Sequence, residues 1–269
     1  MSKQRPKDVA EYRRWLHDEL DVDISSRTRT RYETVSSSIR LGLESSDLWK
    51  ELCSNLDNID GQYRRDTSYT LLATSEKPQL VTKPFGSLIE KTFRKNVLEN
   101  NAWPEEPASG WILPHNWYSE ISDIVRTTIV VKYLDGVEFL ALRIKSLCTD
   151  HGLPCEFELE AREEGYYGAH VRTEREFEVP APNWDTEKIQ VPLEIQITTQ
   201  IKAVIRRLLH KYYEEQRLGI DESREAKWQW DYRSDEFIAA YLGHILHYVE
   251  GMIMEVRERQ REEQHDRMV

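Results

Sequence analysis

The sequence predicts an α+β fold in which a mixed β-sheet core is flanked by N-terminal and C-terminal helices. Three observations support this prediction. Apolar residues recur at helical spacing in the first part of the chain, β-branched or alternating segments fill its middle, and a wide apolar stripe at helical spacing lies near its end. A chain of 269 residues, 39% hydrophobic and 32% charged, suits one large core with a well-solvated surface.

The first stretch, to about residue 72, is predicted to be helical. Val9, Tyr12 and Leu16 recur at helical spacing shortly after a proline. The polar cluster at 45–47 precedes a further apolar stretch and is typical of an N-cap that opens another helix. A polar loop at about 75–84 then leads into a section of different character.

The middle section is predicted to alternate between strands and helices. Residues 123–133 are apolar and rich in β-branched side chains, as in a buried strand, and a turn at Asp135-Gly136 is expected to lead into a helix over 139–147. Residues 190–199 alternate between apolar and polar side chains, which indicates a strand with one buried face. Further strands are predicted at 155–160, where glutamates form an acidic outer face, and at 169–179, and helices are predicted at 200–217 and from about Asp235 onward.

These patterns divide the chain into an N-terminal helical segment (1–74), a core (75–218) and a C-terminal helical extension (219–269). The net charge of −11 argues against a protein that coats nucleic acid non-specifically, because phosphate binding depends on Lys and Arg. Three cysteines without CxxC spacing fit a reducing compartment. No hydrophobic run approaches the length of a membrane span and the polar start is unlike a signal peptide, so we expect a cytoplasmic protein that does not enter a membrane.

Two carboxylates lie on segments that are otherwise suited to burial. Asp123 begins the first predicted core strand, and Glu194 lies on the polar face of a later one. An acid pair held on rigid strands can hold Mg²⁺ beside a phosphate, because Mg²⁺ prefers oxygen ligands. The alternative is that Asp123 caps a strand end and Glu194 faces water.

A cluster of cations and a serine precedes this acid pair. Lys83 lies in a loop, Ser87 at an expected helix start, and Lys91, Arg94 and Lys95 on one side of that helix. Helix N-termini present free N–H groups to anions, so this arrangement can hold a polyphosphate. A solvated amphipathic helix would have the same pattern.

The segment 165–170 places two tyrosines between glycines and ahead of a histidine. Tyr166 and Tyr167 on such a loop suit stacking on a nucleobase. A tight turn with two surface tyrosines is the alternative interpretation, and a lone histidine such as His170 is usually structural.

Taken in order, these motifs resemble the synthetase domain of the RelA/SpoT family over about 83–213, roughly half of the chain. No single motif is specific, whereas the whole set in the correct order at sensible separations is. The matching residues are Lys83, Ser87 and Lys91; Asp123; Gly165, Tyr166 and His170; Glu194, Gln196 and Thr199; and His210, Lys211 and Tyr212.

The resemblance implies a nucleotidyltransferase-like synthetase core and a pyrophosphokinase reaction. Asp123 and Glu194 would be the catalytic acids and would hold Mg²⁺ against ATP, the diphosphate donor, with Glu194 also helping to deprotonate a ribose 3′-hydroxyl. Attack on the β-phosphorus would release AMP and leave a 3′-diphosphate on the acceptor. The remaining implied roles are ATP-phosphate binding by Lys83, Ser87, Lys91, Arg94, His170 and Gln196, and acceptor binding by Tyr166 and Tyr167.

The sequence departs from the family at three cationic positions, now Val81, Thr128 and Thr198. The first two family arginines hold the adenine of ATP, so Arg126 becomes the expected base contact. We also expect no hydrolase domain, and hence a stand-alone small alarmone synthetase.

The combined variant is most like the toxin branch, which implies a growth-inhibiting toxin that pyrophosphorylates the 3′ CCA end of tRNA. Alternatives are a (p)ppGpp or (p)ppApp synthetase, whose acceptor would be a purine nucleotide, and a catalytically dead nucleotide-binding module. A neutralising antitoxin and an oligomeric state also remain open. Basic residues expected to guide tRNA are Lys95, Lys132, Arg206, Arg207 and Lys211.

Overall fold

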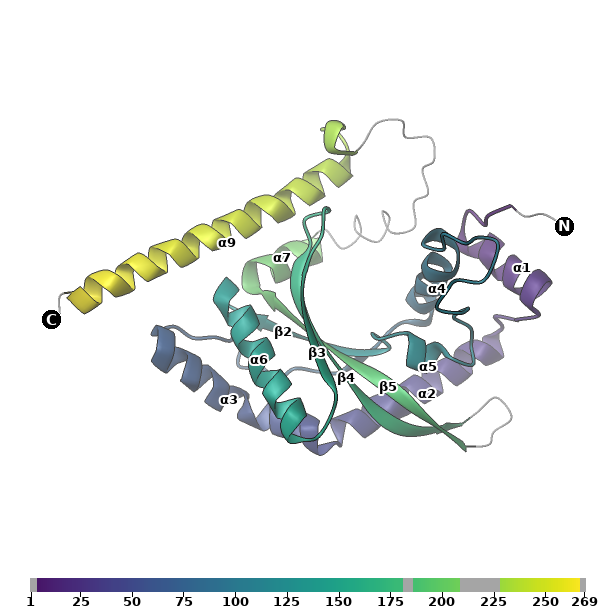
Figure 1. The fold of residues 1–269 in the computed structure, drawn as a ribbon, viewed down its shortest axis with the longest axis horizontal. Coiled ribbons are helices and arrows are strands. Elements are labelled where there is room, and N and C mark those ends of the chain that lie inside the picture. The colour runs from purple at the N-terminus through teal and green to yellow at the C-terminus, as the bar shows by residue number, and fades with distance from the viewer. Residues whose placement is uncertain (1–3, 181–185, 209–227, 267–269) are drawn as a thin grey trace.

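The computed structural model describes residues 4–180, 186–208 and 228–266. The predicted α+β class with a mixed sheet between N- and C-terminal helices is confirmed (Figure 1). The helices are α1 (Val9–Leu20), α2 (Ser26–Glu44), α3 (Asp47–Thr67), α4 (Phe85–Phe93), its π-helical continuation η1 (Arg94–Leu98), α5 (Trp117–Glu120), α6 (Leu134–Asp150), α7 (Gln200–Leu208), the 3₁₀ turn η2 (Trp228–Trp230) and α9 (Asp235–Asp266). The strands are β1 (Val81–Thr82), β2 (Val125–Val131), β3 (Cys155–Ala161), β4 (Tyr167–Pro180) and β5 (Thr186–Thr199).

The five strands form one sheet in the order β1-β2-β5-β4-β3. The β2 and β5 strands run parallel, while the other neighbours are antiparallel. The parallel pair sets Arg126 beside Glu194, and the antiparallel pair sets Arg172 on the other side of Glu194. Because paired residues share a face of the sheet, residues far apart in the sequence meet in rows across the strands.

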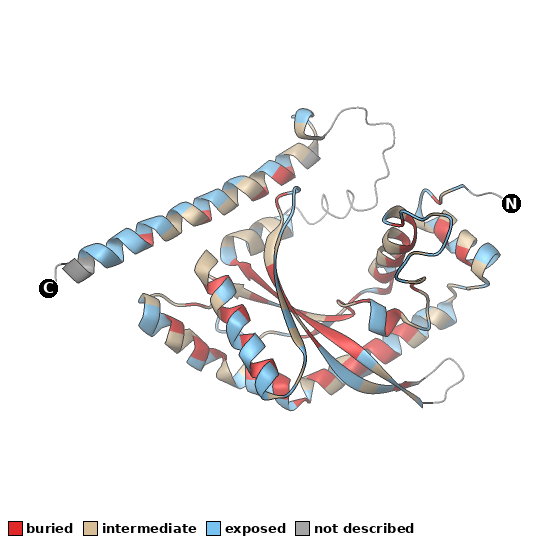
Figure 2. Ribbon diagram, in the orientation of Figure 1, coloured by how far each residue is buried: buried red, intermediate tan, exposed pale blue. Residues whose placement is uncertain are grey.

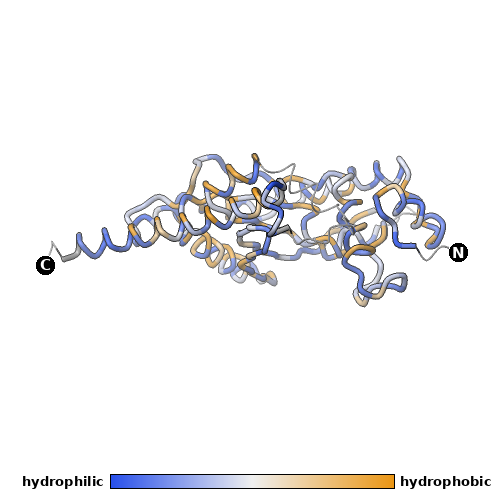
Figure 3. The backbone as a smooth tube through the Cα atoms, turned by 90° about the horizontal axis from the view of Figure 1, so that it is seen from above, coloured by the Kyte–Doolittle hydropathy of each residue, from blue (hydrophilic) through white to orange (hydrophobic). Residues whose placement is uncertain are grey.

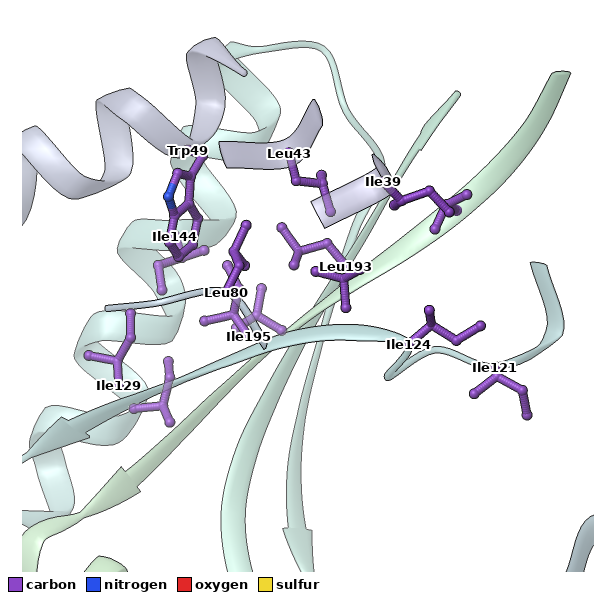
Figure 4. Close-up of a cluster of buried hydrophobic side chains, with 14 of the residues drawn as sticks. Ile39, Leu43, Trp49, Leu80, Ile121, Ile124, Ile129, Ile144, Leu193 and Ile195 are labelled. Carbon is purple, nitrogen blue, oxygen red and sulfur yellow. The ribbon is translucent and has the colours of Figure 1, made fainter. Parts of the chain in front are cut away.

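The alternation along β5 separates a core face from a polar face. Leu193 and Ile195 point into a cluster with Ile39 of α2 and Ile144 of α6 (Figure 4). Figure 2 shows that burial is concentrated where these helices cover the sheet. Glu194 and the other even-numbered residues face the opposite side, as the period of two requires.

The N-terminal helices begin at the polar residues that the sequence indicates. The side chain of Ser46 accepts a hydrogen bond from the Trp49 amide at 3.3 Å, which confirms the predicted N-cap of α3. Ser25 caps α2 and Asp8 caps α1 in the same way. Each cap satisfies an amide that the first turn of a helix leaves without a partner.

The predicted turn at Asp135-Gly136 is wrong, because α6 begins at Leu134 and both residues lie in its first turn. Gly136 permits close packing instead, since a β-carbon there would lie 2.7 Å from Leu71 Cδ1. Asp123 lies two residues ahead of β2 and not inside it. The predicted helix at 200–217 is confirmed as far as Leu208, and the rest lies outside the described residues.

The final helix, α9, runs along the outside of the molecule, and its hydrophilic C-terminal end extends past the other elements (Figures 1 and 3). By length and composition alone its segment Phe237–Glu263 could cross a membrane, which corrects the expectation that no run approaches that length. One such helix is weak support for a membrane span, and α9 carries buried, ion-paired Glu250 and Arg257 that contact the core.

Candidate active site

A pocket of about 790 Å³ lies over the polar face of the sheet. It is lined by α4 and η1 on one side, by β2, β3, β4 and β5 beneath, and by α7 and α9 on the other side. The pocket is lined by every residue to which the sequence assigns a catalytic, ATP-binding or base-stacking role: Lys83, Ser87, Lys91, Arg94, Asp123, Arg126, Tyr166, Tyr167, His170, Glu194 and Gln196. The tertiary fold therefore gathers segments separated by more than a hundred residues.

Asp123 is held by three cations. Its Oδ2 accepts a hydrogen bond from Lys83 Nζ at 2.8 Å, its Oδ1 accepts one from Lys91 Nζ at 2.7 Å, and Arg126 Nη1 lies 3.3 Å from Oδ2. Burial alone would raise the pKa of Asp123, but the ammonium groups of Lys91 and Lys83 outweigh it and hold that pKa far below its usual value. The carboxylate is therefore ionised at neutral pH.

The backbone around Lys83 is fixed by two buried contacts. Its amide donates to Ile124 O at 2.8 Å, and its carbonyl accepts from Tyr32 Oη at 2.7 Å. Tyr32 belongs to α2, so an N-terminal helix outside the predicted core holds a residue of the pocket. The side chain of Lys83 is only 9% exposed, which ties its charge to that of Asp123.

Glu194 lies on the neighbouring strand and is held by Gln196 and His170. Gln196 Nε2 donates to Glu194 Oε1 at 2.6 Å, and His170 Nδ1 lies 3.3 Å from the same oxygen without aligning as a hydrogen bond. Burial raises the pKa of Glu194, but His170 and Gln196 more than offset this and bring it to about 2. Both acids of the predicted pair are thus ionised and face one pocket.

Two charged residues that were not singled out complete this side of the pocket. Glu160 Oε2 lies 2.9 Å from His170 Nε2, and Arg172 Nε lies 3.5 Å from Glu194 Oε2. The glutamates of β3 were expected to form an outer face, whereas Glu160 turns to the pocket and its side chain is only 19% exposed. The sequence could have indicated Arg172, because it follows His170 by two residues on the same strand and residues two apart share a face.

The two tyrosines of the loop diverge. A tight turn closes between Arg162 and Tyr166, with Gly165 at a φ of 77°, a conformation that favours glycine. Tyr166 Oη lies 2.9 Å from His170 Nε2, and the guanidinium groups of Arg162 and Arg206 lie 5.4 and 5.9 Å from the centre of its ring. Tyr166 is thus a ring surrounded by cations within the pocket.

Tyr167 lies against α9 instead. The His247 ring stacks on it with centres 3.8 Å apart and planes 12° apart, and the Tyr167 hydroxyl lies 2.8 Å from His244 Nδ1. One face of the Tyr167 ring is therefore covered. The two histidines are held by packing and hydrogen bonds.

The cations on the α4 side line one side of the pocket. Lys91, Arg94 and Lys95 all line it, which agrees with the shared helical side expected from their spacing, and Arg94 Nε also bonds Glu99 Oε1 at 2.8 Å. Arg126 stands opposite Val81 in the β1–β2 register, and Thr128 pairs with Gln196 in the β2–β5 register. Of the residues expected to guide tRNA, Lys95 and Arg206 reach the pocket, Lys132 bonds Thr70 elsewhere, Arg207 bonds the Ala203 carbonyl oxygen of its own helix, and Lys211 is not described.

Within the described ranges, no three His, Cys, Asp or Glu side chains gather as a metal site. Mg²⁺ does not require such a cluster, since it commonly uses one or two carboxylates together with substrate phosphates and water. The ionised pair Asp123 and Glu194 fits that donor set in charge, and both residues line one pocket. Lys83 and Lys91 occupy the Asp123 oxygens in this structure, so metal binding would require them to release the carboxylate.

Comparison with known proteins identifies the architecture. No family model matches the chain, and no curated protein matches it in sequence. Among solved structures, small alarmone synthetase 1 from Bacillus subtilis matches with a TM-score of 0.50 and 15% identity, over 88% of this chain and 97% of that one. This chain has the fold of a small alarmone synthetase.

Two further structures match less closely. The same synthetase bound to its product pppGpp has a TM-score of 0.49 and 14% identity, over 87% of this chain and 97% of that one. A GTP pyrophosphokinase family protein from Streptococcus pneumoniae has a TM-score of 0.41 and 18% identity, over 87% and 95%. The synthetase fold expected from the motifs is confirmed by the match to small alarmone synthetase 1, while the toxin branch stays a prediction.

Proposed function

We propose that this chain is an ATP-dependent pyrophosphokinase that transfers the β,γ-diphosphate of ATP to a ribose 3′-hydroxyl. The observation that carries the proposal is the pair of ionised acids in one pocket, with Asp123 just before β2 and Glu194 on the adjacent strand β5. Asp123 stands among Lys83, Lys91 and Arg126, and Glu194 is backed by His170. A cation-rich side for a polyphosphate and an aromatic side for a base thus flank two metal-competent acids.

The donor would bind on the α4 side. Lys83, Lys91, Ser87 and Arg94 would contact the triphosphate, and Arg126 the adenine. Mg²⁺ held by Asp123 and Glu194 would neutralise charge on the phosphates. The two lysines are already concentrated around one anion, so exchanging the carboxylate for phosphate oxygens requires only small movements of flexible side chains.

The acceptor would bind on the β4 side with its base on Tyr166. Its 3′-oxygen attacks the β-phosphorus, the bond from that phosphorus to the oxygen bridging to the α-phosphorus breaks, and AMP leaves. Glu194 accepts the hydroxyl proton. A carboxylate whose pKa is about 2 takes that proton only late, when bond formation has made the hydroxyl acidic, so Glu194 contributes mainly by orienting the hydroxyl.

The acceptor proposed first is the 3′ end of tRNA, which would make the protein a growth-inhibiting toxin open to neutralisation by an antitoxin. Lys95 and Arg206 at opposite sides of the pocket support it as phosphate contacts. The likeness to a small alarmone synthetase favours a purine nucleotide as the second candidate. Both candidates use the same donor, metal and chemistry.

The test offers γ-labelled ATP and Mg²⁺ together with deacylated tRNA, GDP, GTP or AMP in separate reactions. Label should appear on one acceptor and should be lost in Glu194→Gln. Glu187→Gln, on the same strand but outside the pocket, is the matched control and should retain transfer. If no acceptor gains label, the enzyme proposal fails and a nucleotide-binding module remains.

A further inference from the structure

The backbone of α9 touches the tyrosine loop directly, through two glycines. A β-carbon added at Gly243 would lie 2.3 Å from the Gly165 carbonyl oxygen, and one added at Gly165 would lie 2.3 Å from the Ala240 carbonyl oxygen. Neither position can hold a side chain without moving the helix away from the loop. The loop of Tyr166 and the helix therefore pack as one unit.

Side chains of α9 extend this contact along the loop. His244 bridges it, with Nδ1 2.8 Å from the Tyr167 hydroxyl and Nε2 2.8 Å from the Glu163 carbonyl oxygen. His247 covers one face of the Tyr167 ring. Two loop residues, one on each side of Gly165, are thus held by two histidines one helical turn apart.

A buried ion pair ties the same stretch of α9 to the end of β5. Lys202 Nζ lies 3.3 Å from Glu250 Oε2 and 2.8 Å from His247 Nδ1, and Glu250 also bonds the Thr199 hydroxyl. The Glu250 side chain is 4% exposed and that of Lys202 12% exposed. Separating buried charged partners is costly, so these contacts fix the position of α9 relative to the end of β5.

The distal part of α9 is anchored to the core at a separate point. The Arg257 guanidinium lies 4.1 Å from the ring centres of both Tyr69 and Tyr133, and it bonds Asp135 at 3.1 Å and Tyr63 at 3.2 Å. Since these partners come from α3, α6 and the segments next to them, the N-terminal half of the chain determines where the helix lies.

We infer that α9 is a positioning element for acceptor binding, and that Gly243, His244 and His247 set the place of Tyr166 in the pocket. The inference rests on the proposed function. Tyr167 then acts as the anchor of the loop to α9, and Tyr166 alone stacks on the acceptor base. In the described part of the chain, the hydrogen bonds and ion pairs of Asp123 are made with Lys83, Lys91 and Arg126 and none is made with α9, so we expect the helix to affect the acceptor side and to leave ATP binding unchanged.

The test compares Gly243→Ala with Gly251→Ala on the same helix. Both substitutions favour a helix, but a β-carbon at Gly251 meets nothing within 4 Å. In Gly243→Ala, amide hydrogen exchange of residues 163–168 should be faster, and the KM for the acceptor should rise at least about fivefold, as expected for a misplaced stacking ring. The KM for ATP should stay within about twofold of the wild-type value. Gly251→Ala should match the wild type in all three.

Loop exchange unchanged in Gly243→Ala would overturn the inference, as would equal increases in both KM values. His247→Ala, which removes the stacked ring without crowding the backbone, should reproduce the selective rise and guards against misfolding of the first variant. If the wild type transfers diphosphate to no acceptor, the proposed function fails separately. Hydrogen exchange then still decides whether α9 holds the loop.

Discussion

Asp123 is the residue on which we expect both the stability of the pocket and the proposed chemistry to depend. Replacing it with Asn leaves Lys83 buried without a counter-charge and next to another ammonium. We expect Asp123→Asn to lower the free energy of unfolding by about 3 kcal/mol and to abolish transfer. Urea unfolding and the labelled-ATP assay measure the two effects.

A double variant separates the effect of Asp123 on stability from its effect on transfer. Asp123→Asn combined with Lys83→Met removes both buried charges, so most of the lost stability should return while transfer stays absent. Recovery of activity in the double variant would show that Asp123 has no chemical role. Failure to recover stability would show that the pair is not the source of the loss.

His247 gives a prediction on pH. Burial lowers its pKa below 6.5, and the charges of Lys202 and His244 lower it further. The unfolded chain therefore takes up this proton more readily, so the contribution of His247 to stability is complete above pH 6.5 and is lost as the pH falls below it. His247→Gln should show a smaller fall in Tm than the wild type between pH 7.5 and about 5.5. An equal fall in both proteins would contradict this.

At the scale of elements, α3 depends on its N-cap. Ser46→Ala removes the bond to the Trp49 amide at a buried helix start and should lower the free energy of unfolding by about 1 kcal/mol. Ser54→Ala, at an exposed position of the same helix, should be neutral or slightly stabilising because alanine is the better helix former. Chemical denaturation of the two variants provides the comparison. Equal free energies of unfolding would show that the Ser46 cap does not stabilise α3.

The strands could be predicted because their patterns are local. Alternation along 190–199 placed Glu194 and Gln196 together on the polar face, and the structure places both there. Asp123 was predicted to begin its strand, and it lies two residues before the first residue of β2. The order of motifs also indicated which polar side chains share a pocket, because the family fold supplies the contacts that a single sequence does not.

The contacts of α9 could not be predicted. His244 lies 77 positions from Tyr167, and no spacing in the sequence connects them. Gly243 interrupts a helical stripe, where a glycine has no sequence signal beyond lower helix propensity. The turn expected at Asp135-Gly136 failed for a related reason, since Gly136 is required by Leu71 rather than by backbone conformation. Both features depend on long-range packing, which local sequence patterns do not indicate.

At the scale of the whole molecule, an acidic chain surrounds a pocket rich in cations. The net charge of −11 opposes a polyanionic acceptor beyond the pocket, so tRNA would be held by few phosphate contacts. With two contacts, at Lys95 and Arg206, a slope of about −0.7 per contact predicts a roughly sevenfold rise in the KM for tRNA between about 50 and 200 mM salt. A rise of about a thousandfold would indicate a much larger basic surface than the described residues provide.

The position of bond cleavage in ATP tests the proposed reaction most directly. The measurement uses ATP labelled at the α-phosphate, with the acceptor that takes up γ-label, and follows the labelled nucleotide product against time. Transfer of an intact diphosphate predicts one AMP for each modified acceptor, with both absent in Glu194→Gln. Labelled ADP in place of AMP, or AMP formed without a modified acceptor, would contradict pyrophosphate transfer in this pocket.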